Sequence, residues 1–265
     1  RVTSGAPLIQ YNTITSQNTG PALRTDYSNP IVKYCLISGG NSANESIAVR
    51  IFGGKPHLEE NTIIGGNTSA DYSESYTVWA DDSTEAIFYK NTITGGTAGG
   101  AEGESFGFFL DWNARPLIVG NNIYGGAAPG DGGMSNGIYF INNGKSTVWN
   151  NTINGGEGKG MARALYSAYG TNLYLRYNLI TNKAEGTGKK YGIYFGANGR
   201  VRRLIGNLFS NVDTAHQYTF ITNENITDVD DLNSTYNAGG DFANSDTTSV
   251  TQAPVPTELG KQGWE

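Results

Sequence analysis

The chain has 265 residues, a formal net charge of −6 and only 16% charged residues, with 37 glycines, 16 tyrosines and a single cysteine. This composition is too aromatic for a disordered low-complexity chain, and the lack of a clustered basic face argues against nucleic acid as a partner. One cysteine excludes an intrachain disulfide framework, and no apolar run is long enough to form a transmembrane segment.

A six-residue phrase of the form Asn-x-Ile-x-Gly-Gly recurs at a fixed period of 30 residues, beginning at Asn61, Asn91, Asn121 and Asn151. Weaker copies extend the repeat in both directions, beginning at Asn12, Cys35, Asn178 and Asn207. A fixed period in this range is typical of a chain that stacks copies of one small unit. Cys35 stands where the other copies have Asn, so we interpret it as a small buried residue and not as a reactive thiol.

Each repeat contains three short β-prone runs and no helical pattern. In the copy over 137–156, an apolar run is followed by the turn residues 142–145 and by two further runs, and Gly155 and Gly156 close the copy. Such runs preserve the period when each pairs in parallel with the same run one coil away, about 4.8 Å distant. The pattern predicts an all-β fold, a single-stranded right-handed parallel β-helix of about eight or nine coils of 23–30 residues. We place this domain at 1–240 and interpret 241–265 as a C-terminal cap, linker or truncated coil.

Like residues occupy like positions in successive coils. Two residues after each Asn position stands an apolar residue that we expect to point inward, as at Ile14, Ile37, Ile63, Ile93, Ile123, Ile153, Ile180 and Phe209. Three residues before it stands a second inward set, Leu58, Phe88, Ile118, Val148, Leu175 and Leu204. The Asn positions are predicted to form an amide ladder at a bend, composed of Asn61, Asn91, Asn121, Asn151, Asn178 and Asn207. We expect the paired glycines to supply positive φ at the turn that follows.

The strand triplets, the inward aliphatic stacks and the Asn ladder over about residues 12–240 resemble the right-handed parallel β-helix superfamily typified by pectate and pectin lyases. The Asn-Thr-Ile-x-Gly-Gly phrasing also resembles uncharacterised bacterial surface proteins built from such repeats. The resemblance implies the fold. It leaves the function open, because the superfamily includes polysaccharide lyases, glycoside hydrolases, phage tailspikes and adhesins.

Alternation along the first run of each coil predicts a column of outward aromatic side chains, Trp79, Phe109, Tyr139, Tyr166 and Tyr194. Aromatic faces can stack on sugar rings, so this column is the candidate carbohydrate-binding surface. Two residues beyond, on the same face, stand Asp81 and Asp111, which we expect to orient sugar hydroxyls. The alternative is that the loops after the glycine pairs cover the column, or that the column is an interface.

A catalytic interpretation of the same face uses Asp81, Asp111, Arg115 and Lys145. Facing carboxylates can divide acid and base roles in glycoside hydrolysis, and β-elimination requires a Lys or Arg as base or as the group that neutralises a uronate. The alternative is that the aspartates are ordinary surface carboxylates and that Glu85, Arg115 and Lys145 belong to a surface ion-pair ladder. No compact acid, base and metal constellation converges in the sequence, so we lean toward no enzymatic activity.

The sequence favours an extracellular or cell-surface β-helix protein that recognises a polysaccharide without catalysis. The alternatives are a polysaccharide lyase or glycoside hydrolase acting on the outer face of the helix, and a structural or adhesive surface repeat protein. No cofactor or metal site is predicted, although facing carboxylates leave Ca²⁺ as a candidate ligand. No signal peptide is present, and the chain begins at Arg1 without Met, so we expect a mature form or an excised fragment.

Overall fold

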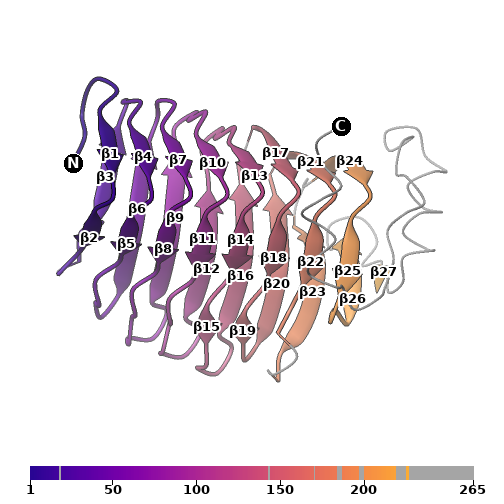
Figure 1. Cartoon of the computed structure of the whole chain (residues 1–265). Coiled ribbons are helices and arrows are strands. Elements are labelled where there is room, and N and C mark those ends of the chain that lie inside the picture. The colour runs from indigo at the N-terminus through magenta and orange to yellow at the C-terminus, as the bar shows by residue number, and fades with distance from the viewer. Residues whose placement is uncertain are drawn as a thin grey trace.

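The computed structural model describes residues 1–17, 19–142, 144–169, 171–183, 187–196, 200–218 and 225–226. The chain winds into a rod of stacked coils, with the N-terminal coils at one end and the later coils following in chain order (Figure 1). Three parallel sheets run along the rod, and each coil contributes one strand to each of them. The predicted all-β parallel β-helix is confirmed, whereas the predicted segment 241–265 lies outside the described residues. None of the described residues forms a helix long and apolar enough to cross a membrane.

The strands are short and recur in the same order in every coil. Sheet B contains β1 (Leu8–Gln10), β4 (Ile31–Lys33), β7 (His57–Glu59), β10 (Ile87–Tyr89), β13 (Leu117–Val119), β17 (Lys145–Trp149), β21 (Asn172–Arg176) and β24 (Arg200–Ile205). Sheet C contains β2 (Thr13–Thr15), β5 (Leu36–Ser38), β8 (Thr62–Ile64), β11 (Thr92–Thr94), β14 (Asn122–Tyr124), β18 (Thr152–Asn154), β22 (Leu179–Thr181) and β25 (Leu208–Ser210).

Sheet A has the longest strands and carries the candidate site. It contains β3 (Leu23–Asp26), β6 (Glu45–Phe52), β9 (Glu74–Asp81), β12 (Glu104–Leu110), β16 (Met134–Ile141), β20 (Met161–Ala168), β23 (Lys189–Phe195) and β26 (Thr214–Tyr218), and β27 (Asn225–Ile226) pairs antiparallel with β26. A small two-stranded sheet, β15 (Ala127–Ala128) and β19 (Glu157–Gly158), joins two of the loops between sheets C and A.

The interior of the rod is a continuous apolar core, because each sheet turns like residues inward at the same height in every coil. Ile93 pairs in register with Ile63 on one side and with Ile123 on the other. The apolar positions after the Asn residues are fully buried from Ile37 to Phe209, while Ile14 in the first coil is partly buried. The second inward set is fully buried at Leu58, Phe88, Ile118, Val148 and Leu175, and the side chain of Leu204 lies outside those described.

The Asn side chains form a hydrogen-bond relay along the axis. The side-chain oxygen of Asn121 accepts hydrogen bonds from the backbone N–H (2.8 Å) and the side-chain NH₂ (3.0 Å) of Asn91. The NH₂ group of Asn121 donates to the carbonyl of Phe88 at 2.9 Å and to the side-chain oxygen of Asn151 at 3.0 Å. The same pattern links Asn61, Asn91, Asn121, Asn151, Asn178 and Asn207. The relay therefore satisfies backbone groups at the bend between sheets B and C, where sheet pairing is interrupted.

The residue before each ladder position makes the bend itself. In all eight coils it has a φ between 52° and 67°, at Tyr11, Tyr34, Glu60, Lys90, Gly120, Asn150, Tyr177 and Gly206. A left-handed residue turns the chain sharply within one step, so the strands of sheets B and C follow one another almost without a loop.

The relay stops at the N-terminal side of the rod. The backbone N–H of Cys35 donates to the side-chain oxygen of Asn61 at 2.9 Å, which continues the pattern for one step. The Cys35 thiol lies near the carbonyls of Lys33 (3.2 Å) and Ile9 (3.7 Å), and the side chain of Asn12 donates within its own coil to Gln10. Among the described residues, no side-chain amide hydrogen bond of the ladder therefore reaches the first coil.

The expectation that the glycine pairs supply positive φ is wrong for most of them, since among the pairs only Gly126 and Gly156 have it. The pairs are required because neighbouring coils approach closely at this turn. A Cβ added to Gly96 would lie 1.9 Å from the carbonyl oxygen of Gly66, and one added to Gly66 would lie 2.0 Å from that of Gly40. The repeated glycines therefore mark a backbone contact and not a backbone conformation.

Replacing Asn121 with alanine should destabilise the rod by roughly 2–5 kcal/mol, because two or more buried backbone groups lose their partners. Urea unfolding would measure the change, with Asn122→Ala as the matched control. Asn122 is the next residue and is exposed on sheet C, so its loss should change the free energy of unfolding by about 0.5 kcal/mol or less. Equal destabilisation by both variants would contradict a structural role of the relay.

Gly96→Ala should also destabilise the protein strongly, because its Cβ would overlap the backbone of the neighbouring coil. Gly20→Ala provides the control, since nothing lies within 4 Å of a Cβ at Gly20 and its φ is not in the left-handed region. Thermal unfolding should show a lower midpoint for Gly96→Ala and an unchanged or slightly higher one for Gly20→Ala. A Gly96→Ala protein with the wild-type midpoint would show that the glycines are not needed for close approach.

Candidate functional site

The strands β9, β12 and β23 of sheet A bend in their middle, and the bend decides which side chains meet on the outer face. In β9 two consecutive residues, Thr77 and Val78, are both fully buried on the inside. Tyr76 and Trp79, on either side of them, have ring centroids only 4.7 Å apart, which a flat strand does not allow for residues three apart. The corresponding pairs Phe106–Phe109 and Tyr191–Tyr194 lie at 5.3 and 5.0 Å. The bend therefore brings side chains three residues apart together on the outer face of sheet A.

The predicted aromatic column is present as an in-register stack. Ring centroids are 5.5 Å apart for Trp79–Phe109, 5.2 Å for Phe109–Tyr139, 4.3 Å for Tyr139–Tyr166 and 5.7 Å for Tyr166–Tyr194. The last three pairs are stacked with interplanar angles of 16–22°. Because the rings cover one another's faces, they present mainly their edges to solvent, and all five are half-buried.

A second group of side chains completes an apolar cluster on the outer face. Ile47, Tyr76 and Phe106 are buried against one another and against Trp79, Phe109 and Tyr139, separately from the core of the rod. We call the six side chains of this cluster, together with Tyr166 and Tyr194, the outer cluster. The sequence pattern missed the column of Tyr76 and Phe106, because strict alternation from Trp79 would point it inward.

At the N-terminal end of the outer cluster an arginine is held between an aromatic ring and a carboxylate. The Arg50 guanidinium lies 3.5 Å from the centroid of the Trp79 ring, and its Nη2 is 2.5 Å from Oδ2 of Asp81. Asp81 is only 4% exposed. Burial raises the pKa of Asp81 to about 6, against the opposing effect of the Arg50 charge, and Asp111 adds to the rise.

At the C-terminal side a second arginine lies beneath the tyrosines. Arg163 is 5% exposed, and its guanidinium carbon lies 4.7–5.7 Å from the ring centroids of Tyr139, Tyr166 and Tyr194. Its Nη2 is 3.9 Å from a carboxylate oxygen of Glu104. Burial raises the pKa of Glu104, while the charge of Arg163 opposes that rise. Asn136, fully buried one coil away, occupies the position between Phe106 and Arg163 in the same column.

Buried polar atoms without hydrogen-bond partners concentrate in this strip. Among the described residues they include atoms of Arg50 (Nη1), Trp79 (Nε1), Asp81 (Oδ1), Asn136 (Oδ1 and Nδ2) and Arg163 (Nε). Buried polar groups are normally satisfied, so a row of unsatisfied donors and acceptors on one face calls for an explanation. Arg50 and Trp79 are half-buried and border the open surface, whereas Asp81, Asn136 and Arg163 are buried.

The four predicted catalytic residues are only partly brought together. Asp111 lies one coil from Asp81, because its backbone N–H donates to the carbonyl of Ala80, and its carboxylate accepts from the N–H of Trp112 and from the side chain of Asn142. Arg115 precedes β13 and Lys145 begins β17, so both lie on the side of sheet B. In the part of the chain that is described, neither forms an ion pair with Asp111, and the Lys145 ammonium lies 4.7 Å from the ring of Tyr174. Glu85, in the same column, pairs with Lys55 at 2.6 Å.

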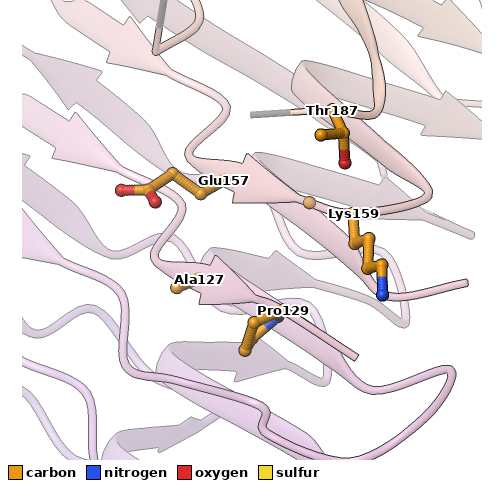
Figure 2. A pocket seen from close by; sticks show the side chains of 6 residues that line it. Ala127, Pro129, Glu157, Lys159 and Thr187 are labelled. Atoms are coloured by element: carbon orange, nitrogen blue, oxygen red, sulfur yellow. The ribbon is translucent and has the colours of Figure 1, made fainter. Parts of the chain in front are cut away.

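A cavity of about 230 Å³ lies among the loops between sheets C and A, lined by Ala127, Pro129, Glu157, Gly158, Lys159 and Thr187 (Figure 2). Its one carboxylate is already engaged, since Glu157 accepts from the Tyr124 hydroxyl at 2.8 Å and pairs with Lys183. The cavity therefore offers little polar recognition. Within the described ranges, no group of three or more His, Cys, Asp or Glu residues is arranged to hold a metal ion.

Comparison with known proteins bears on the fold. The model of the family described as "Right handed beta helix region" matches residues 2–128 and 67–251. A solved structure of QnrB1, a plasmid-mediated fluoroquinolone resistance protein, is similar at 12% identity and a TM-score of 0.21, covering 79% of this chain and 83% of that chain. That likeness is too low to carry a structural argument. No curated protein matches the sequence.

The raised pKa of Asp81 makes stability depend on pH in a defined direction. Between the ordinary value of 3.8 and the folded value of about 6, the folded protein binds more protons than the unfolded chain, so the free energy of unfolding falls as pH rises through this window. We expect a fall of about 1–3 kcal/mol from this group. Urea unfolding at several pH values should show the slope in the wild type and a flatter one in Asp81→Asn, whereas Asp131→Asn, an exposed loop carboxylate, should keep the wild-type slope. An identical slope in Asp81→Asn would disprove the assignment.

Proposed function

Since the chain belongs to the right-handed β-helix family, we propose that it recognises a polysaccharide along the outer face of sheet A without catalysis. The observation that supports the proposal is the row of buried, unpaired polar atoms set among the aromatic side chains of the outer cluster. A sugar hydroxyl is both a donor and an acceptor, so a hydroxyl-rich chain can satisfy guanidinium, amide and carboxylate groups together. The apolar parts of a sugar would pack against the ring edges between these groups.

An extended ligand fits the spacing of these groups better than a single sugar does. Arg50 and Asp81 lie on β6 and β9, whereas Arg163 lies on β20, three coils beyond β9. Three coil spacings amount to about 14 Å, more than one sugar ring can span. We therefore propose a polymer or oligosaccharide that runs along the rod, and we place the protein outside the cell or on its surface, where such polymers are available.

The proposal gives the five predicted carbohydrate-binding residues a different role from the one expected from the sequence. Four of the rings, from Phe109 to Tyr194, stack on one another, and Arg50 covers a face of Trp79. The rings would therefore contribute edges and, at Tyr139, Tyr166 and Tyr194, hydroxyl groups. Arg50, which is half-buried, and Arg163, whose side chain keeps 7% exposure, would provide the directional hydrogen bonds. This division of roles differs from the sequence-based expectation, in which the ring faces carried the contact.

A second candidate function is glycoside hydrolysis by Asp81 and Asp111. One observation favours it: the raised pKa of about 6 would keep Asp81 protonated in mildly acidic solution, as a general acid requires. Carboxylates one coil apart, at about 4.8 Å, also approach the separation of about 5–5.5 Å found in retaining enzymes. The placement of Arg115 and Lys145 on the side of sheet B gives no comparable support to a lyase.

Affinity electrophoresis through gels containing neutral β-glucan, galactomannan, xylan, polygalacturonate or alginate tests the proposal. We expect at least one polymer to retard the wild type and Arg163→Met to weaken this binding roughly tenfold or more, since a charged hydrogen-bonding group is worth about 1.5–3 kcal/mol. Methionine preserves much of the volume of Arg163 and suits its neighbour Met134. Arg176→Met, on sheet B, is the control and should bind normally.

The same incubations separate the alternatives. Reducing ends that disappear in Asp81→Asn and Asp111→Asn would establish the hydrolase, and an unsaturated product absorbing in the ultraviolet would establish a lyase. Failure of every polymer to retard the wild type would overturn the proposed function and leave a structural or adhesive role.

A further inference from the structure

The exposed aromatic residues in the described part of the chain share one backbone conformation. Each has a φ between 47° and 56°: Tyr11, Tyr27, Tyr34, Tyr72, Trp112, Tyr169 and Tyr177. The left-handed region favours glycine, asparagine and aspartate, and it directs the side chain of a corner residue outward. Tyr11 and Tyr34 stack on each other at 5.1 Å, and Tyr27 contacts Phe52, so packing accounts for these three. Among the described residues, Trp112 and Tyr169 have no such ring contact, so their backbone strain calls for another reason.

One set of left-handed residues forms a row along the corner where sheet A ends. Backbone hydrogen bonds from Tyr27 to Phe52, from Gly53 to Asp81, from Ser83 to Trp112 and from Asn113 to Asn142 fix the register. Together with the pairing of Ile141 with Ala168, they align one residue from each of six successive coils. We call these residues the corner row: Tyr27, Gly53, Asp82, Trp112, Asn142 and Tyr169. All six have positive φ.

Aromatic and polar side chains alternate along the C-terminal part of the corner row. Asp82, Trp112, Asn142 and Tyr169 follow one another at one residue per coil, so Trp112 and Tyr169 are two coils, or about 10 Å, apart. Trp112 is 67% exposed and Tyr169 54% exposed. Among the described residues, no ring contact or side-chain hydrogen bond engages the indole of Trp112, in contrast to the mutually stacked rings of the outer cluster.

Tyr27 shows how a corner ring is fixed on the surface. Its hydroxyl bonds to the carboxylate of Asp82, its edge meets the ring of Phe52 at 5.1 Å, and two of its ring carbons would lie 2.6 Å from a Cβ at Gly53. The ring therefore lies over a glycine, while the residue as a whole is 64% exposed. A ring held in this way has lost its rotamer freedom before any ligand arrives, which lowers the cost of stacking on it.

The corner row borders the outer face of sheet A. Trp112 directly follows Asp111, and the backbone N–H of Trp112 donates to that carboxylate at 2.6 Å. Asn142 donates from the other side to the same carboxylate at 3.3 Å. The column that contains Asp81 and Asp111 thus separates the corner row from the stacked aromatic column, and one ligand can reach both.

We propose that the corner row is the sugar-stacking edge of the binding site, with Trp112 and Tyr169 stacking on alternate rings of a glycan that runs parallel to the rod axis. Asn142, which lies between the two aromatic residues, and Asp82, one coil before Trp112, hydrogen-bond the sugar hydroxyls. The ligand class rests on the function proposed above. The corner row offers free ring faces, which the outer cluster does not, because Trp112 and Tyr169 are exposed and separated by a polar residue.

The test compares Trp112→Ala, Tyr169→Ala and the double variant with the wild type by affinity electrophoresis on the same five polymers. Each single variant should bind about tenfold more weakly, and the double variant should show no measurable retardation. Tyr72→Ala is the matched control, because Tyr72 is 70% exposed with a φ of 56° but lies in the loop between sheets C and A. All variants should keep the wild-type midpoint of thermal unfolding, because replacing these exposed side chains with alanine removes no buried contact.

The outcomes separate this inference from the proposed function. Normal binding by the Trp112 and Tyr169 double variant, with loss of binding in Arg163→Met, would overturn the corner row and leave the proposed function standing. Loss in the double variant with normal binding by Arg163→Met would support the corner row and remove the outer cluster from the site. An equal loss of polymer binding in Tyr72→Ala would also overturn the inference, because binding would then depend on exposed aromatic residues in general and not on the corner row. If no polymer retards the wild type, both proposals fall.

Discussion

The axial register between coils is the constraint on which the rest of the structure depends. From Asn61 to Asn207, successive coils must place their ladder residues directly above one another. The side-chain oxygen of each later Asn accepts from both the backbone and the side chain of the Asn before it, as Asn121 does from Asn91. With that register fixed, every other column follows: inward isoleucines, close glycines, stacked rings and paired charges. Equivalent positions in successive coils therefore form columns along the rod, and a residue type or contact found in one coil tends to recur in its neighbours.

The outer face of sheet A shows what a bend adds to such a column. A flat strand would have turned Tyr76 and Arg163 toward the core, where a guanidinium has no place. The bend instead brings them beside Trp79 and Tyr166, so charged and aromatic groups share a partly dry surface. Arg50 and Arg163 are each held against rings as well as carboxylates, and cation–π contact supplements the ion pair in both cases. Binding chemistry and structural packing are thus built from the same side chains.

The fold could be predicted from the sequence because period and alternation are local properties that repeat. The inward positions from Ile37 to Phe209 and the outward position of Trp79 follow from them directly. The role of Gly66 and Gly96 could not be predicted, since the approach of two coils at the glycine turn is a tertiary property that φ preferences do not express. Arg163 was missed for a related reason: its outward position depends on the bend, which breaks the alternation rule within a single strand. The corner row could not be predicted although Asp82, Trp112, Asn142 and Tyr169 each stand nine residues before a ladder Asn. The residue type at this position changes from coil to coil, and the positive φ that these residues share is not visible in the sequence.

The substitution of cysteine for asparagine at position 35 has a consequence for how the rod comes apart. A solenoid behaves as a one-dimensional chain in which each coil is held by its neighbours alone. Coils from Asn61 onward share an amide relay, whereas the first coil is attached to the second through sheet pairing and apolar contact without it. The first coil therefore lacks the axial amide contact that the later coils share, and it can open and reclose while the amide-linked coils stay closed. The single thiol of the protein lies at this junction, where such opening would uncover it.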